Sequence, residues 1–197
     1  MDYRILKLVN PVELHAKDPN MGLSILFYYY NKLVEDNLLK KLFYDGTITT
    51  WDDFRLFFLD KYIISYIIYS IELARPIAHI HFTSFEGYSA RVHFSVLKEF
   101  HGTGVDKLAI EVFSKFFSEK KRVDGTPIAT SLIGVTPTSN RLAIRTLKLS
   151  GFQPQFVVPQ ACFQAYARTP YYDSGLVSMM TIESLGIARD RLNRLVS

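Results

Sequence analysis

The stretch Phe94–Phe117, FSVLKEFHGTGVDKLAIEVFSKFF, sets the plan of this chain. Residues Ala90–Leu97 alternate between apolar and polar side chains, which predicts a strand. A short polar turn with Gly102 and Gly104 follows. Beyond it, apolar residues recur every three or four positions, which is typical of an amphipathic helix. The stretch therefore predicts a strand, a glycine turn and a helix N-terminus in direct succession.

A glycine turn before a helix has a chemical use. The first turn of a helix leaves backbone N–H groups unpaired, and the helix dipole makes that end positive. Glycine lets the backbone approach a ligand closely. Hydrogen bonds to a charged group contribute about 1.5–3 kcal/mol each, against about 0.3–1 kcal/mol for the dipole. We therefore expect the amides of Phe100–Val105 to bind phosphate, although many such turns only connect elements.

Composition indicates a folded protein. The chain has 197 residues, with 12 Tyr, 15 Phe and a net charge of +4. This aromatic content excludes a disordered chain. The mild positive charge fits a polyanionic ligand or an acidic partner, and a solvated basic surface is the more common cause. The single cysteine, Cys162, cannot form an internal disulfide, which agrees with a reducing compartment.

Neither the N-terminus nor the most apolar run of the sequence indicates a membrane protein. The N-terminal MDYRILKLVN lacks the long apolar core of a signal peptide. The most apolar run, Tyr62–Leu73, has twelve residues, too few for a membrane span. We expect a soluble, cytoplasmic protein without a membrane partner.

The first half of the chain combines a strand, two helices and three more strands. Asn10-Pro11 ends the first strand, and Asp18-Pro19 starts a helix with a cap and a proline. Thr50 and Asp53 have capping-box spacing. The Ile- and Tyr-rich run predicts a strand buried on both faces. The predicted elements are strand Tyr3–Val9, a helix from Asp18-Pro19 to about Leu42, helix Trp51–Asp60, and strands Tyr62–Leu73, Ile77–Thr83 and Ala90–Leu97.

The second half alternates helices and strands before a final basic helix. The predicted elements are the helix of residues 104–118, strand Ser131–Val135, a helix from about Ser139 to Leu149, and strands Phe152–Val158 and Leu176–Ile182. Early and late hairpins with helical crossovers between them predict a mixed sheet in an α/β (α+β) fold. We expect one domain over residues 1–197, without repeats or linkers.

A second segment complements the glycine turn. Asn140 near a helix start, Ala143 three residues later and Gly151-Phe152 at a strand entry resemble the fourth helix of the GNAT acyltransferase superfamily. The turn Glu99-Phe-His-Gly102-Thr-Gly104 resembles that family's pyrophosphate motif, [Q/R]-x-x-G-x-[G/A]. Glu99 departs from the motif, but the glycines agree. Both motifs stand in the family's order.

The resemblance implies a fold and a co-substrate. It implies a mixed, mostly antiparallel sheet with a splayed strand pair, Ala90–Leu97 and Ser131–Val135, and helices on both faces. Acetyl-CoA would be the co-substrate, with its pantetheine arm along the first of these strands. A backbone amide there would polarise the thioester carbonyl. The implied CoA-binding residues are Val96, Leu97, Phe100, His101, Gly102, Thr103, Gly104, Val105 and Asn140. For Asn140, a helix cap is the alternative.

A general base is needed because an amine must lose a proton before it attacks. Alternation predicts that His79, His81 and Thr83 share one strand face, with Arg91, His93 and Ser95 on the next strand. Histidine has a suitable pKa, so His81 and His93 are candidates. Polar residues on a half-exposed sheet face are the plainer explanation.

Other residues leave the catalytic assignment open. Glu72, at the end of the apolar run, is a further candidate base. His101 is better suited to phosphate. Many family members carry a Tyr general acid where this chain has Leu147, which cannot donate a proton. A thiol leaves readily enough that this loss need not abolish turnover.

Several residues can be explained either by a function or by an ordinary structural or solvated role. Cys162 suggests a covalent route, but a lone buried thiol is usually inert. Basic side chains would reach the CoA phosphates or be solvated: Lys107, Arg141, Arg145 and Lys148. Tyrosines of the late loop would line an acceptor site or pack: Tyr166, Tyr171 and Tyr172. Terminal arginines would contact nucleic acid or a second subunit of a homodimer, and a solvated helix face is favoured: Arg189, Arg191 and Arg194.

Three function classes follow. The favoured one is an N-acetyltransferase that moves acetyl directly from acetyl-CoA to an amine. The alternative is a non-catalytic protein on the same fold, which Leu147 favours. Nucleic-acid binding rests on mild basicity alone and ranks last. The acceptor stays open among small amines, peptides, protein N-termini, lysine and aminoacyl-tRNA. No metal ligand set is expected.

Overall fold

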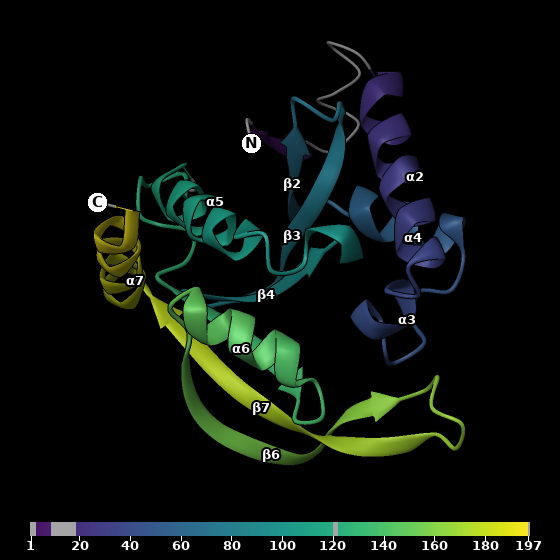
Figure 1. The fold of residues 1–197 in the computed structure, drawn as a ribbon. Helices are drawn as coiled ribbons and strands as arrows, with labels where there is room; N and C mark the ends of the chain where they lie inside the picture. The colour runs from purple at the N-terminus through teal and green to yellow at the C-terminus, as the bar shows by residue number, and fades with distance from the viewer. Residues whose placement is uncertain (1–2, 9–18, 120–121, 197) are drawn as a thin grey trace. The chain divides into compact units, whose positions relative to one another are not determined.

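The computed structural model describes residues 3–8, 19–119 and 122–196 (Figure 1). These residues form two compact units, which are described separately. Of the described residues, the first unit comprises 3–8, 19–83, 93–101 and 164–170, and the second comprises 84–92, 102–119, 122–163 and 171–196. The hydrogen-bonded strand order is β1-β2-β3-β4-β5-β7-β6, in a mixed and mostly antiparallel sheet.

The first unit is built on a buried central strand. β2 (Ile64–Ser70) pairs antiparallel with β1 (Tyr3–Leu8) and with β3 (Arg75–Glu86). Tyr66, Ile67 and Ile68 are fully buried, although neighbouring side chains point to opposite faces. The prediction of a strand with two buried faces is therefore confirmed for Ile64–Ser70, but the predicted bounds Tyr62–Leu73 are too wide.

The helices of the first unit are shorter than the sequence predicted. The single helix to Leu42 is wrong: α2 is Pro19–Glu35 and α3 is Leu39–Leu42. Asn37 lies between them with a φ of 55°, a left-handed conformation that Asn tolerates better than most residues. The Leu38 amide donates to Leu33 O at 2.8 Å, which closes the end of α2. The predicted cap at Asp18 lies outside the described residues.

The capping box of the next helix is confirmed. In α4 (Trp51–Leu59), the Thr50 hydroxyl accepts from the Asp53 amide at 3.2 Å. The Asp53 carboxylate accepts from the Thr50 amide at 2.9 Å, and this lowers the pKa of Asp53 together with further Thr50 and Thr49 contacts. Aspartate thus replaces the usual glutamate without loss of the motif.

The second unit contains the parallel strand pair. β4 (Ser89–Val96) pairs parallel with β5 (Ser131–Pro137) only from Ser89↔Ser131 to Arg91↔Ile133, although both strands continue. β5 also pairs antiparallel with β7 (Tyr171–Thr181). Parallel pairing that stops part-way agrees with the predicted splayed pair.

Three helices cover the strands of the second unit: α5 (Val105–Glu119), α6 (Arg141–Leu149) and α7 (Ile182–Val196). α5 packs on α6 and α7 (Figure 1). Phe113 of α5 meets Phe152 with ring centroids 5.7 Å apart. None of the helices in the described ranges is long and apolar enough to cross a membrane.

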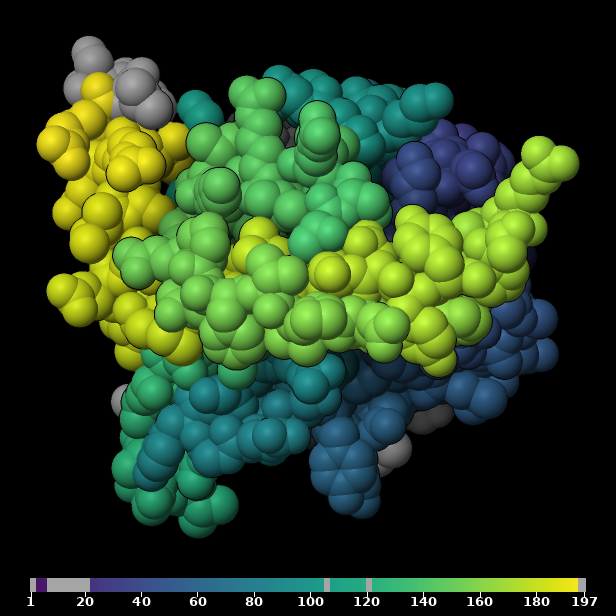
Figure 2. Space-filling view, turned by 90° about the horizontal axis from the view of Figure 1, so that it is seen from below, coloured from purple at the N-terminus to yellow at the C-terminus, as the bar shows by residue number. Residues whose placement is uncertain are grey.

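The two last strands are longer than predicted. β6 is Gln153–Gln164, and β7 begins at Tyr171 rather than Leu176. Ile182 starts α7 instead of ending the strand. β6 is at the end of the strand order, and its residues 153–161 are exposed along the face shown in Figure 2. Apolar periodicity underestimates such an exposed strand because little of it faces a core.

Two glycines of the second unit give a matched test of packing. Gly151 has a φ of +98°, and a Cβ there would lie 2.9 Å from Ala188 Cβ. Gly151→Ala should lower the free energy of unfolding by about 1–3 kcal/mol. Gly186 lies inside α7 with open space around it, so Gly186→Ala should raise stability by about 0.5–1 kcal/mol. Urea unfolding of both variants checks the opposite signs, and equal effects would contradict this packing.

Candidate active site

The glycine turn has the conformation that the sequence predicted. The 3-10 helix η1 (Lys98–Phe100) leads into it, and α5 begins at Val105. Gly102 has a φ of 78° and Gly104 a φ of 84°, which side-chain-bearing residues rarely adopt. A Cβ at Gly102 would meet no atom within 4 Å, so space is open there. Both glycines are therefore required by backbone conformation, and the approach to Gly102 is open.

The residues before the turn are bonded within the first unit. The Leu97 amide donates to Ile77 O at 3.0 Å, and the Leu97 side chain is fully buried. His101 is exposed, and its Nε2 donates to Val96 O at 3.0 Å. The proposed contact of Leu97 with a pantetheine arm would therefore have to use groups other than its amide. The Phe100 amide donates to Leu97 O at 2.9 Å and the His101 amide to Lys98 O at 3.1 Å, so the expectation that these two amides bind phosphate is wrong. Contacts of Val96, Leu97, Phe100 and His101 through other groups stay predictions.

Asn140 is a helix cap. Its Oδ1 accepts from the Ala143 amide at 3.2 Å at the start of α6, so the alternative reading is confirmed. This cap engages the carbonyl oxygen of the side chain and not Nδ2. A contact of Nδ2 with a ligand stays a prediction.

A carboxylate of β7 holds the loop before α6. Asp173 accepts from the Ser139 hydroxyl at 2.7 Å, from the Ser139 amide at 3.1 Å and from the Thr138 hydroxyl at 2.9 Å. These hydrogen bonds, the Ser139 hydroxyl first, lower the pKa of Asp173. Sequence reasoning missed Asp173, because nothing near it in the chain marks it as a partner of a loop 34 residues earlier.

The basic side chains of α6 are exposed. Arg141, Arg145 and Lys148 follow at intervals of four and three residues, so they share one helix face. Lys107 on α5 is exposed as well. The second unit therefore contains both the glycine turn and these cations. Their exposed positions are compatible with phosphate binding and with simple solvation.

Leu147, at the position where the resembled family often has a tyrosine, makes an apolar contact. A Cβ built on Gly134 of β5 would lie 3.4 Å from Leu147 Cδ1. The Leu147 side chain thus packs against β5 at Gly134, where the strand has no side chain. This position offers no acid.

Histidines form a stack in the first unit. The rings of His81 and His93 lie 4.6 Å apart at 10°, and those of His79 and His81 lie 5.1 Å apart at 27°. Phe58 of α4 covers His79 at 4.5 Å. The predicted common face of His79 and His81 is confirmed, but the face is an aromatic core rather than a half-exposed surface. The stacked rings form no metal site, and no group of metal ligands occurs among the described residues.

Burial decides the protonation of these rings. His79 and His81 are fully buried, and their ring nitrogens find no hydrogen-bond partner among the described residues. Burial, followed by the neighbouring His93, lowers the pKa of His79 to about 3 and lowers that of His81 well below its usual value. Both rings are neutral at physiological pH. His93 is only half-buried, so it is the accessible member of the stack.

Tyr29 of α2 closes the same core beside β4. Its hydroxyl donates to Ser95 O at 3.0 Å, and burial raises its pKa. The contact joins residues 66 positions apart, which sequence patterns do not reveal.

The structure does not bring Glu72 to the histidines. β2 ends at Ser70, so Glu72 lies in the exposed turn rather than at a strand end. The register places Arg75 opposite Ser70 and His81 opposite Ser65. His81 is therefore roughly 20 Å along the strand from this turn. The placement of Glu72 on the strand is wrong, and its role as base has no geometric support.

The remaining candidates divide between core and surface. Cys162 is fully buried. Tyr166 is 37% exposed in the first unit, where Lys40 lies 5.4 Å from its ring centre. Tyr171 and Tyr172 are exposed in the second unit. The terminal arginines Arg189, Arg191 and Arg194 are exposed on α7.

The buried histidines predict a pH dependence of stability. Because their pKa values are lowered on folding, the unfolded chain binds protons that the folded chain does not, and stability falls as the pH drops below about 6.5. Each histidine contributes a slope of up to about 1.4 kcal/mol per pH unit, for His79 down to about pH 3. Urea unfolding between pH 7 and 4 should show a shallower slope in His79→Phe and His81→Phe. Slopes equal to that of the unaltered chain in both variants would contradict this assignment.

Comparisons with known proteins yield structural relatives only. No protein-family model matches the sequence, and no curated protein matches it. The spermidine N-acetyltransferase of Vibrio cholerae, solved with CoA and spermine, is 10% identical, with a TM-score of 0.68 over 93% of this chain and 97% of that chain. The ribosomal-protein-S5-alanine acetyltransferase of Vibrio fischeri is 10% identical, with a TM-score of 0.65 over 92% of this chain and 93% of that one.

A third structural relative is a member of the GNAT family. An acetyltransferase of the GNAT family from Streptococcus pneumoniae is 13% identical, with a TM-score of 0.59 over 92% of this chain and all of that chain. Likeness at such low identity is likeness of fold. The chain therefore has the fold of the GNAT acetyltransferases.

Proposed function

We propose that this protein is an N-acetyltransferase that moves an acetyl group directly from acetyl-CoA to an amine. The observation that carries the proposal is the pair of left-handed glycines, Gly102 and Gly104, at the start of α5 in a chain with the GNAT fold. The structural relatives are acetyltransferases, and one was solved with CoA.

The glycine turn fits a diphosphate. Residues Gly102–Val105 supply backbone N–H groups ahead of the helix, where the dipole favours negative charge. Open space at Gly102 leaves room for phosphate oxygens. The exposed Lys107 and the basic face of α6 add long-range attraction. The remaining proposed CoA contacts are Val96, Leu97, Phe100, His101 and Asn140.

In the reaction, acetyl-CoA supplies the acetyl group as a thioester. The amine nitrogen forms a bond to the carbonyl carbon, the carbon–sulfur bond breaks, and the electron pair leaves with sulfur. His93 takes the proton that the amine loses, because it is the accessible ring of the histidine stack. His81 stays neutral behind it. Glu72 is left out because it lies in the distant exposed turn.

The leaving sulfur needs no dedicated acid. Leu147 cannot donate a proton, and it packs against β5 instead. A thiol has a pKa near 8.5, so its thiolate is a tolerable leaving group in water. Solvent therefore delivers the proton to the leaving sulfur.

We further propose that the two units work as one domain. The structural relatives with TM-scores of 0.65 and 0.68 match over 92–93% of the chain, which spans both units. The acceptor is an amine of open identity. A cytoplasmic location and a homodimer stay predictions.

A matched pair of glycine variants tests the diphosphate turn. Gly102→Glu puts bulk and negative charge into the turn, and calorimetry should show loss of CoA binding. Gly125→Glu is the control, because Gly125 also has a φ of +80° and open space, and lies in the loop before β5. Equal strain is expected in both variants, so only Gly102→Glu should lose CoA. Equal CoA affinity in the two variants would reject the turn as the site.

Release of free thiol tests turnover. Acetyl-CoA is supplied with a panel of polyamines, peptides with free N-termini and lysine peptides, and release above background is expected for at least one acceptor class. His93→Gln should lower kcat by roughly 100-fold, within the usual contribution of a general base, with little change in CoA affinity. Binding of CoA without release from any acceptor would favour the non-catalytic alternative.

A further inference from the structure

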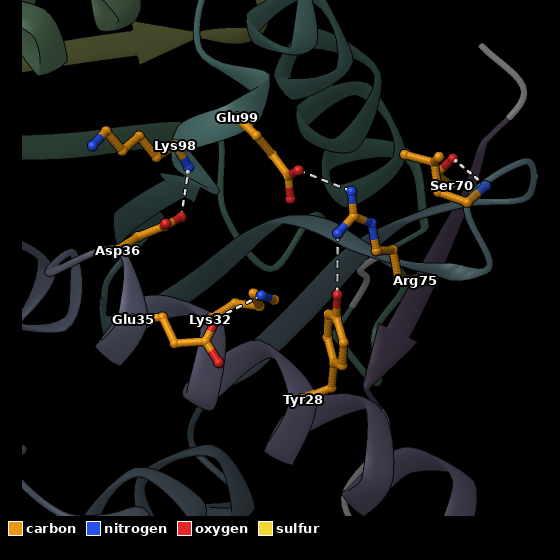
Figure 3. Close-up of polar contacts among 9 residues, drawn as sticks. Tyr28, Lys32, Glu35, Asp36, Ser70, Arg75, Lys98 and Glu99 are labelled. Atoms are coloured by element: carbon orange, nitrogen blue, oxygen red, sulfur yellow. Dashed lines mark hydrogen bonds and ion pairs between the residues drawn. The ribbon is translucent and has the colours of Figure 1, made fainter.

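Arg75 joins three elements of the first unit. At the start of β3, its Nη2 donates to Glu99 Oε2 at 2.9 Å, and its Nη1 donates to the Tyr28 hydroxyl at 3.3 Å (Figure 3). Its guanidinium also lies 5.6 Å from the ring centre of Phe100. One planar side chain thus contacts α2 and two successive residues of η1.

Backbone contacts fix the rest of this short helix. The Lys98 amide donates to Asp36 Oδ2 at 3.1 Å, just beyond the end of α2 (Figure 3). The Leu97 amide donates to Ile77 O, and Phe100 is 5% exposed. Each residue from Leu97 to Phe100 is therefore anchored. The chain passes directly from these residues into the turn at Gly102.

The charge of Glu99 needs compensation. Glu99 stands at the motif position where the resembled family has Gln or Arg, three residues before Gly102. A carboxylate near a bound diphosphate would repel it. Arg75 pairs with this carboxylate, and arginine can serve both as a hydrogen-bonding fork and as a stacked cation.

The contact is too exposed to serve mainly as a stabilising ion pair. The side chains are 26% and 45% exposed, and pairs of this kind add little to stability in water. Its geometry instead restricts where η1 lies and cancels a charge at one end of the turn. These two effects act on ligand binding.

We propose that Arg75 is a positioning residue for the diphosphate turn: it holds η1 in place and neutralises Glu99. This inference rests on the proposed CoA-binding function. It adds a residue from β3, far in sequence from the glycine turn, to those on which binding depends.

Arg75→Met tests both effects. Hydrogen exchange, measured without ligand, should rise by roughly tenfold at the Phe100 and His101 amides, whose acceptors are Leu97 O and Lys98 O. Calorimetry should show CoA binding weakened by roughly tenfold, about what one charge-assisted hydrogen bond supplies. The KM for acetyl-CoA should rise with kcat unchanged, because Arg75 touches no reacting atom.

Controls separate charge from general damage. Arg55→Met removes a partly exposed arginine of the same unit, paired with Asp52 within α4, and should change neither readout. Arg75→Lys keeps the charge but not the fork, so its CoA affinity should be intermediate. Glu99→Gln added to Arg75→Met should recover CoA binding at least in part, because the unpaired carboxylate is removed.

The outcomes are distinct. Exchange and CoA affinity in Arg75→Met equal to those of Arg55→Met would overturn the proposal. Raised exchange with unchanged CoA affinity would also overturn it, since η1 would then be held for another reason. Failure of the unaltered chain to bind CoA would reject the proposed function and the diphosphate role together, while exchange would still decide whether Arg75 holds η1.

Discussion

The left-handed conformation of Gly102 and Gly104 is the constraint on which the candidate site depends. It turns the chain between the end of η1 at Phe100 and the start of α5 at Val105. A residue with a Cβ would be strained there by roughly 1–2 kcal/mol at each position. The turn follows η1 closely in the chain, because only His101 separates Phe100 from Gly102.

Local features of the fold could be predicted from the sequence. The capping box at Thr50, the buried β2 strand and the strand–turn–helix plan all depend on residues a few positions apart. The break at Asn37 could not be predicted from apolar spacing, because Leu38 and Leu39 continue the helical pattern of apolar residues although the helix has ended. Helix propensity is a weak signal, and tertiary contacts can override it.

The candidate site was only partly accessible to sequence reasoning. Motif spacing located the glycine turn and Asn140, but the polar partners Arg75, Tyr29 and Asp173 lie 24, 66 and 34 residues from the groups that they bind. Alternation predicted that His79 and His81 face the same way. It could not show that α4 would cover them with phenylalanine rings and remove them from solvent.

The exposed edge strand β6 has a consequence for the behaviour of the protein in concentrated solution. Phe156, Val157 and Val158 form an apolar run of the kind that templates intermolecular β-sheets. Pro154 and Pro159 flank this run, and because they are five residues apart, one of them lacks an N–H toward the open edge of the strand. Gln160, with a φ of 53°, interrupts the extended backbone. Prolines and breaks of this kind beside an apolar run are the gatekeepers by which proteins generally disfavour intermolecular pairing at an exposed edge.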